Sequence, residues 1–83
     1  MKLRVQGPRV LIAASNGERA RACADALGLA HSGWCYVWDE KSLLGLGPDD
    51  CRVILEDSWR QHAHANDIAC AIRALNLRTV SVK

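Results

Sequence analysis

Two stretches of the chain share one pattern of apolar and polar residues. Each opens on an arginine, runs through three large aliphatic residues and then reaches a serine: RVLIAASNGE from Arg9 and RVILEDSWRQ from Arg52. A continuous aliphatic run bounded by polar residues is typical of a strand that is buried on both faces, as in parallel sheets. In each stretch a Glu or Gln follows the serine by three residues, which is the spacing of a capping box at a helix start. The chain is therefore predicted to contain two strand–helix units of one design.

Helical spacing follows each serine. One face of the first predicted helix carries Ala20, Cys23, Ala24 and Leu27, and Gly28 is predicted to end this helix. A second, longer helix is predicted from about residue 59 to residue 75, with an inward stripe of Gln61, His64, Ala65, Ile68, Ile72 and Leu75. The predicted capping boxes pair Ser15 with Glu18 and Ser58 with Gln61.

Two further segments alternate in polarity. They are WCYVWDE (34–40), with Trp34, Tyr36 and Trp38 on one side, and RTVSVK (78–83). Alternation is typical of half-exposed edge strands, whereas the two aliphatic strands belong in the centre of a sheet. The order strand–helix–strand–strand–helix–strand predicts a single α/β domain over residues 1–83, in which residues 1–8 are a candidate loose arm. Its parallel four-stranded sheet has the order 2-1-3-4, counted along the chain.

The weakest element of this prediction is the connection from Asp39 to Cys51. It is barely long enough for a parallel crossover, although KSLLGLG within it supplies a turn or two of helix. A ferredoxin-like α+β fold has the same element order and is the alternative. Its RNA-binding version carries aromatic residues on the first and third strands. Those strands are RVLIAA and RVILED here and have none, so the parallel fold is favoured.

A parallel sheet of this order brings polar residues together where the chain reverses direction, at the carboxyl ends of the first and third strands. The residues predicted to meet in this crevice are Ser15, Asn16, Gly17, Glu56, Asp57 and Ser58. A helix N-terminus there favours anions, and a divalent ion such as magnesium would have to bridge a nucleotide or phosphate to the acidic rim. The other interpretation is that the serines and acids only cap helices. No G-x-x-x-x-G-K-[ST] or G-x-G-x-x-G motif is present.

One segment carries a family resemblance. LLGLGPDDCRVILED, residues 43–57, resembles the stretch that leads into the Walker B strand of helicase- and terminase-type P-loop ATPases. The resemblance implies that Glu56 or Asp57 handles magnesium and water. VLIAASNGERA stands where the phosphate loop would be but departs from it in the missing lysine and the spacing. The whole chain also resembles short Rossmann-like α/β proteins encoded by bacteriophages, which implies a reduced P-loop-like core.

Composition and charge give no support to several classes of function, although they leave nucleic acid open as a partner. The net charge is +2, so no strong field favours nucleic acid or a membrane surface, and nucleic acid binding is not indicated. No apolar run approaches the roughly 20 residues of a membrane span, and MKLRVQGPR lacks the apolar core of a signal peptide, so a cytoplasmic protein is expected. The four cysteines form no C-x-x-C pair and are predicted to be buried free thiols: Cys23, Cys35, Cys51 and Cys70. His62 and His64 would point apart on a helix, so no metal site is predicted. A nucleophile pair of Cys35 with His31 has no supporting third group, so no catalytic group is predicted.

The remaining signal is an uncovered sheet. In the 2-1-3-4 order the first helix alone covers one face, which leaves the side of the third and fourth strands bare. The function predicted from this is a small non-enzymatic interaction module, viral or from a mobile element, that forms a homodimer or docks on a partner protein. The candidate interface residues are Trp34, Tyr36, Trp38, Val80 and Val82. The three aromatic residues have two other interpretations, as core beneath a helix and as a stacking platform for bases.

Overall fold

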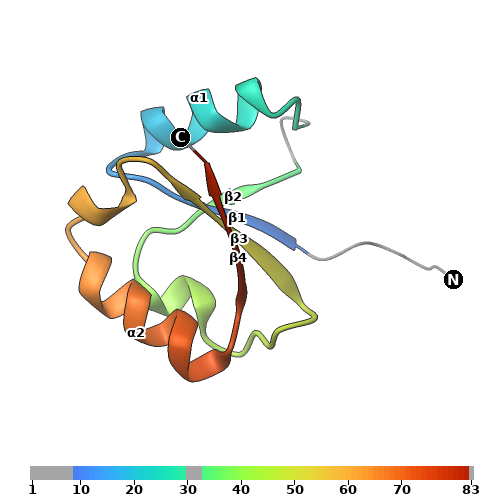
Figure 1. Cartoon of the computed structure of the whole chain (residues 1–83), viewed down its shortest axis with the longest axis vertical. Coiled ribbons are helices and arrows are strands. Elements are labelled where there is room, and N and C mark those ends of the chain that lie inside the picture. The colour runs from blue at the N-terminus through green and yellow to red at the C-terminus, as the bar shows by residue number, and fades with distance from the viewer. Residues whose placement is uncertain (1–8, 30–32, 83) are drawn as a thin grey trace, which may run out of the picture.

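A computed structural model describes residues 9–29 and 33–82 of the chain. Along the chain it contains β1 (Arg9–Ala13), α1 (Gly17–Ala26), β2 (Cys35–Tyr36), η1 (Glu40–Leu43, a 3-10 helix), β3 (Cys51–Glu56), η2 (Trp59–Gln61, a 3-10 helix), α2 (Ala65–Leu75) and β4 (Arg78–Val82) (Figure 1). All neighbouring strands are parallel, and their order is β2-β1-β3-β4. The predicted α/β fold is confirmed, and the antiparallel ferredoxin-like alternative is wrong.

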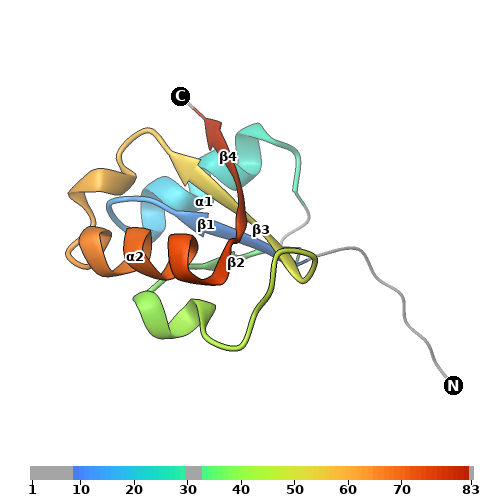
Figure 2. The same cartoon turned by 60° about the horizontal axis from the view of Figure 1, so that its bottom comes forward.

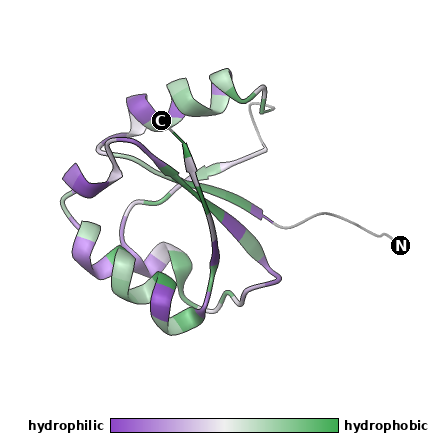
Figure 3. Cartoon of the chain, in the orientation of Figure 1, coloured by the Kyte–Doolittle hydropathy of each residue, from purple (hydrophilic) through white to green (hydrophobic). Residues whose placement is uncertain are grey.

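The sheet lies between two helical layers, because the central strands are apolar on both faces. Leu11 and Val53 are in register and face α2 and η1, whereas Ile12 and Ile54 are in register and face α1. Figure 2 shows α2 and η1 on the near side of the sheet and α1 behind it. Figure 3 shows the hydrophobic colour concentrated along the central strands. Each face therefore has its own apolar cluster, and β1 and β3 belong to both.

Helix α1 begins one residue later than the predicted capping box requires. Asn16 is its N-cap, with extended backbone at φ −159°, and its Oδ1 accepts a hydrogen bond from the Arg19 N–H at 2.9 Å. Ser15 instead donates its own N–H to Ser58, so the predicted box of Ser15 with Glu18 is wrong. Both residue types cap helices well, and the backbone conformation decides between them. Gly28, with φ +72°, follows the end of the helix as predicted.

The second predicted helix is interrupted. Residues 59–61 form the 3-10 helix η2, and α2 begins only at Ala65. The Ser58 side chain makes no capping hydrogen bond, so the predicted capping box of Ser58 with Gln61 is wrong. At the break, the buried ring of His62 bonds to the backbone of Val37 and of His64. Its Nδ1 accepts from the His64 N–H at 2.9 Å, and its Nε2 lies 2.9 Å from the Val37 carbonyl oxygen. The predicted inward position of His64 is therefore wrong: it is exposed.

Other predictions for single side chains are confirmed only in part. Ala20, Cys23 and Ala24 are the buried face of α1, but Leu27 is exposed. Cys23 and Cys51 are buried free thiols, whereas Cys35 and Cys70 are exposed. The connection between β2 and β3 contains the expected turn of helix, η1, and its Leu43 is fully buried against the sheet. No helix among the described residues is both long and apolar enough to cross a lipid bilayer.

Candidate functional site

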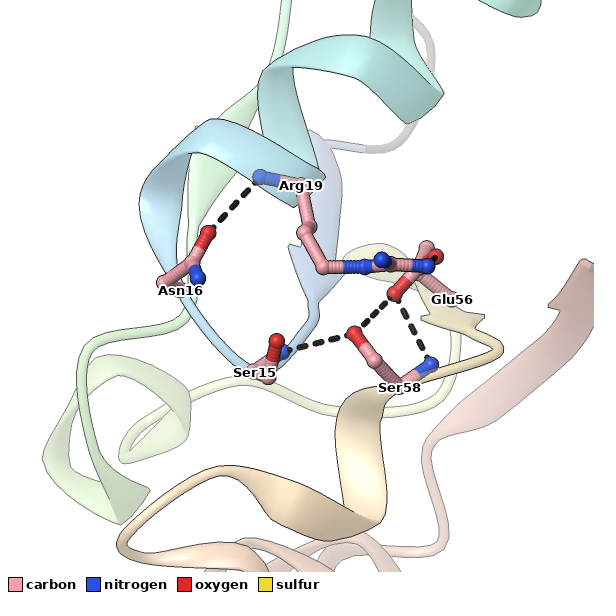
Figure 4. A network of polar contacts seen from close by, with 5 residues as sticks. All are labelled: Ser15, Asn16, Arg19, Glu56 and Ser58. Atoms are coloured by element: carbon pink, nitrogen blue, oxygen red, sulfur yellow. Dashed lines mark hydrogen bonds and ion pairs between the residues drawn. The ribbon is translucent and has the colours of Figure 1, made fainter.

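A network of hydrogen bonds joins the carboxyl ends of β1 and β3 (Figure 4). Glu56, the last residue of β3, accepts at Oε2 from Arg19 Nη2 at 3.0 Å, and at Oε1 from the Ser58 N–H at 2.9 Å and from the Ser58 hydroxyl. The same hydroxyl oxygen accepts from the Ser15 N–H at 3.1 Å. The network therefore links the loop after β1, the first turn of α1 and the turn after β3.

Burial and charge act in opposite directions on the Glu56 carboxylate, which is only 8% exposed. Burial alone would raise its pKa, but the hydrogen bonds from Arg19 and Ser58 and the Arg19 charge outweigh it, and the pKa lies below the ordinary value. In return, the hydrogen bond to Glu56 and its charge raise the pKa of Arg19. The carboxylate is thus held ionised, as a buried acid with a partner usually is.

The structure places the six predicted crevice residues in different roles. Ser15, Glu56 and Ser58 bond to one another, and Asn16 caps α1. Gly17 is the first residue of α1, and a Cβ added there would meet no atom within 4 Å, so its backbone makes no close approach that requires glycine. Asp57 is exposed and acts on the network only through its charge, which contributes to raising the pKa of Arg19.

The buried carboxylate of Glu56 lies in the crevice between the ends of β1 and β3 and bonds there to Arg19 and Ser58. Among residues 9–29 and 33–82, Arg19 is the cation that bonds in this crevice, and its guanidinium is engaged by Glu56. Sequence reasoning missed Arg19, although a signal was available: a strand that ends in a buried acid needs a basic partner, and Arg19 stands one turn into the neighbouring helix. The network is structural, because it fixes the loop after β1 against the turn after β3.

Beside the network, the α1 face of the sheet is hollowed between α1 and β4. The hollow has a volume of about 410 Å³ and is lined by Glu18, Arg19, Ala22, Cys23, Glu56 and Val82. Val80, the next residue of β4 on this face, is 49% exposed. Burial raises the pKa of the Cys23 thiol, with a further rise from the Glu56 charge, which disfavours the thiolate form of this residue.

The predicted aromatic stripe is divided between core and surface. Trp34 and Tyr36 pack partly against the α1-face cluster, and the Tyr36 hydroxyl donates to the Ala14 carbonyl at 3.2 Å. Burial raises the pKa of Tyr36. Trp38 is 70% exposed and meets Tyr36 edge to face, with ring centroids 4.7 Å apart. These three rings and the start of α1 border a groove of about 320 Å³.

Comparison of the chain with protein-family models, with curated proteins and with solved structures finds no match.

Proposed function

We propose that this protein is a non-enzymatic interaction module that associates with a second copy of itself through the outer edge of β4. The observation that carries the proposal is that β4 is an exposed, regular strand at the edge of the sheet. β4 is a regular strand of five residues, in register with β3 along its whole length. Within residues 9–29 and 33–82 its other edge has no strand partner, and Arg78 to Ser81 are all exposed.

Such an edge offers unpaired backbone groups to another strand. Natural edges are usually protected by charges, proline or a bulge, but the central residues of β4 are Thr79, Val80 and Ser81. Helix α1 packs on β1 and β3 and leaves Val80 uncovered on the same face. The β4 edge therefore combines free backbone groups with an apolar side chain at its centre.

The charges favour an antiparallel arrangement of two copies. Arg52 and Arg78 are in register at the start of the β3–β4 pair, and Glu56 and Asp57 stand at its end. A parallel pair of β4 strands would place the two Arg78 side chains next to each other. An antiparallel pair about a two-fold axis at Val80 places each Arg78 at the acidic end of the other copy, and Val80 opposite its own copy. The product is a continuous eight-stranded sheet.

A contact of five residues on each side is small, so the association is expected to be weak. Interfaces of this size lie below the standard class, and a dissociation constant on the order of 10 to 100 µM is expected. Sedimentation equilibrium of the full chain across this range of concentrations measures it. Val80→Lys places a charge at the centre of the edge and is expected to give a monomer. Leu44→Lys, at a site 63% exposed in the connection after η1, is the matched control and is expected to leave the dimer intact.

Cross-linking tests the orientation. In a chain with Cys35→Ser and Cys70→Ser, which removes the exposed thiols, Val80→Cys brings two sulfurs together across the two-fold axis, because opposed Cβ atoms in antiparallel strands are about 5 Å apart. Air oxidation is expected to give a covalent dimer with Val80→Cys and none with Leu44→Cys. A wild-type chain that remains a monomer at several hundred micromolar would refute the proposal.

A further inference from the structure

We propose that Glu40, His64 and Asp67 form a binding site for a divalent transition-metal ion of the zinc class. Each residue offers one ligand atom, and the three atoms lie within 4.8 Å of one another. Glu40 begins η1, His64 is the N-cap residue of α2, and Asp67 is in the first turn of α2. This inference does not depend on self-association, because none of the three residues belongs to the β4 edge.

The core holds the two segments that carry these residues in place. Leu43 of η1 and Ile68 of α2 are both fully buried in the same apolar cluster. On the α2 side, the buried His62 ring fixes the backbone next to the site. Because its Nδ1 accepts from the His64 N–H, its Nε2 carries the proton and donates to the Val37 carbonyl. Both ring nitrogens of His62 are therefore occupied by hydrogen bonds to the backbone. The His64 ring, in contrast, makes no capping bond to the helix.

The ligand set determines the kind of ion. An imidazole nitrogen with two carboxylate oxygens suits zinc and its neighbours, whereas magnesium and calcium prefer oxygen alone. Zinc binds such atoms at about 2.0–2.2 Å, which places tetrahedral ligands roughly 3.4 Å apart. The three side chains are exposed or half-buried, so their rotation can bring the ligand atoms from within 4.8 Å of one another to this shorter spacing. A fourth position remains for water.

Electrostatics also favour a cation at this position. The ion pairs among the described residues engage Glu56 and Asp49 and leave the Glu40 and Asp67 carboxylates without a basic partner. Two carboxylates at this separation repel each other, and a bound cation removes the repulsion. Two features work against tight binding: the positive end of the α2 dipole, and the neighbouring Arg60, whose guanidinium carbon lies 4.9 Å from the centroid of the Trp59 ring.

Isothermal titration with zinc chloride tests the site. The Cys35→Ser and Cys70→Ser chain is used, because exposed thiols would also bind zinc. One zinc per chain is expected to bind. Glu40→Gln, His64→Gln and Asp67→Asn are each expected to raise the dissociation constant at least tenfold. Asp25→Asn, which removes an exposed carboxylate of α1, is the matched control and is expected to leave it unchanged.

Cobalt provides a second measurement on the same chain. Bound Co²⁺ is expected to broaden the amide signals of residues near 40, 64 and 67 and to show no sulfur-to-metal charge-transfer band. Circular dichroism of each variant checks that the fold is retained. The proposal is overturned if the triple variant Glu40→Gln, His64→Gln, Asp67→Asn binds zinc as well as its parent, or if no binding is detected at millimolar zinc.

Discussion

Replacement of Ser58 by alanine is the most direct test of the polar network between the ends of β1 and β3. The Ser58 hydroxyl is buried, accepts from the Ser15 N–H at 3.1 Å and donates to Glu56. Ser58→Ala removes both bonds and leaves the Ser15 N–H without its acceptor, while the backbone bond from the Ser58 N–H to Glu56 remains. A lost bond to a charged group costs about 1.5–3 kcal/mol, and a lost neutral bond costs about 0.5–1.5 kcal/mol.

Ser15 is only partly buried, so water replaces some of what its N–H loses. We therefore expect a total loss of about 2–3 kcal/mol in the free energy of unfolding. For a domain of this size, each kcal/mol lowers Tm by about 4–8 °C, so the expected shift is roughly 10–20 °C. Urea denaturation and thermal melting, both followed by circular dichroism, measure these two quantities.

The matched control is Ser81→Ala, which removes an exposed hydroxyl from β4 and is expected to change stability by less than about 0.5 kcal/mol. If Ser58→Ala costs no more than Ser81→Ala, the network contributes nothing to stability and has no structural role.

Three further predictions concern the same crevice. Asn16→Ala is expected to lower the free energy of unfolding by about 1 kcal/mol, because it removes the α1 cap. Ser15→Ala is expected to lower it little, because alanine keeps the backbone N–H. The urea midpoints of the two variants test this difference. The pKa of Glu56 is lowered in the folded state. Its contribution to stability is therefore present above the ordinary glutamate pKa and is lost as pH falls through the folded pKa. In Glu56→Gln, Tm is expected to decrease less than in the wild type between neutral pH and pH ~3. ATP with magnesium is expected to leave Tm unchanged, and a clear concentration-dependent rise would instead support nucleotide binding at this crevice.

The strand pattern made the fold predictable, because RVLIA and CRVILE are apolar at positions that face both ways, which is typical of central strands of a parallel sheet. The same topology brought Ser15, Glu56 and Ser58 together as expected. The helix starts were harder to predict. Ser15 and Asn16 are adjacent residues of types that cap equally well, and in the structure Asn16 is the N-cap while the Ser15 N–H bonds to Ser58.

The environment of the histidines could not be predicted from spacing alone. An unbroken helix from residue 59 would turn His64 inward, but the bond from His62 to Val37 is a contact across the fold that no local pattern encodes. The Glu40, His64 and Asp67 cluster was missed for the same reason, since Glu40 reaches it only through the packing of η1 beneath α2. Cys70 lies off the buried face of α2 that carries Ile68, and Cys35 lies on the short edge strand β2, so both thiols are exposed.

The parallel sheet has a consequence for how the chain folds. Each of its strand pairs joins residues more than twenty positions apart in the sequence, as with Leu11 and Val53 or Ile54 and Val80. No local hairpin is present among the described strands to nucleate the sheet, so the entropy of loop closure must be lost before β1 and β3 meet. We expect the central β1–β3 pair to form first and β4 to join last. Val53→Ala, which weakens the central pair, is then expected to slow folding, and Val80→Ala is expected mainly to speed unfolding.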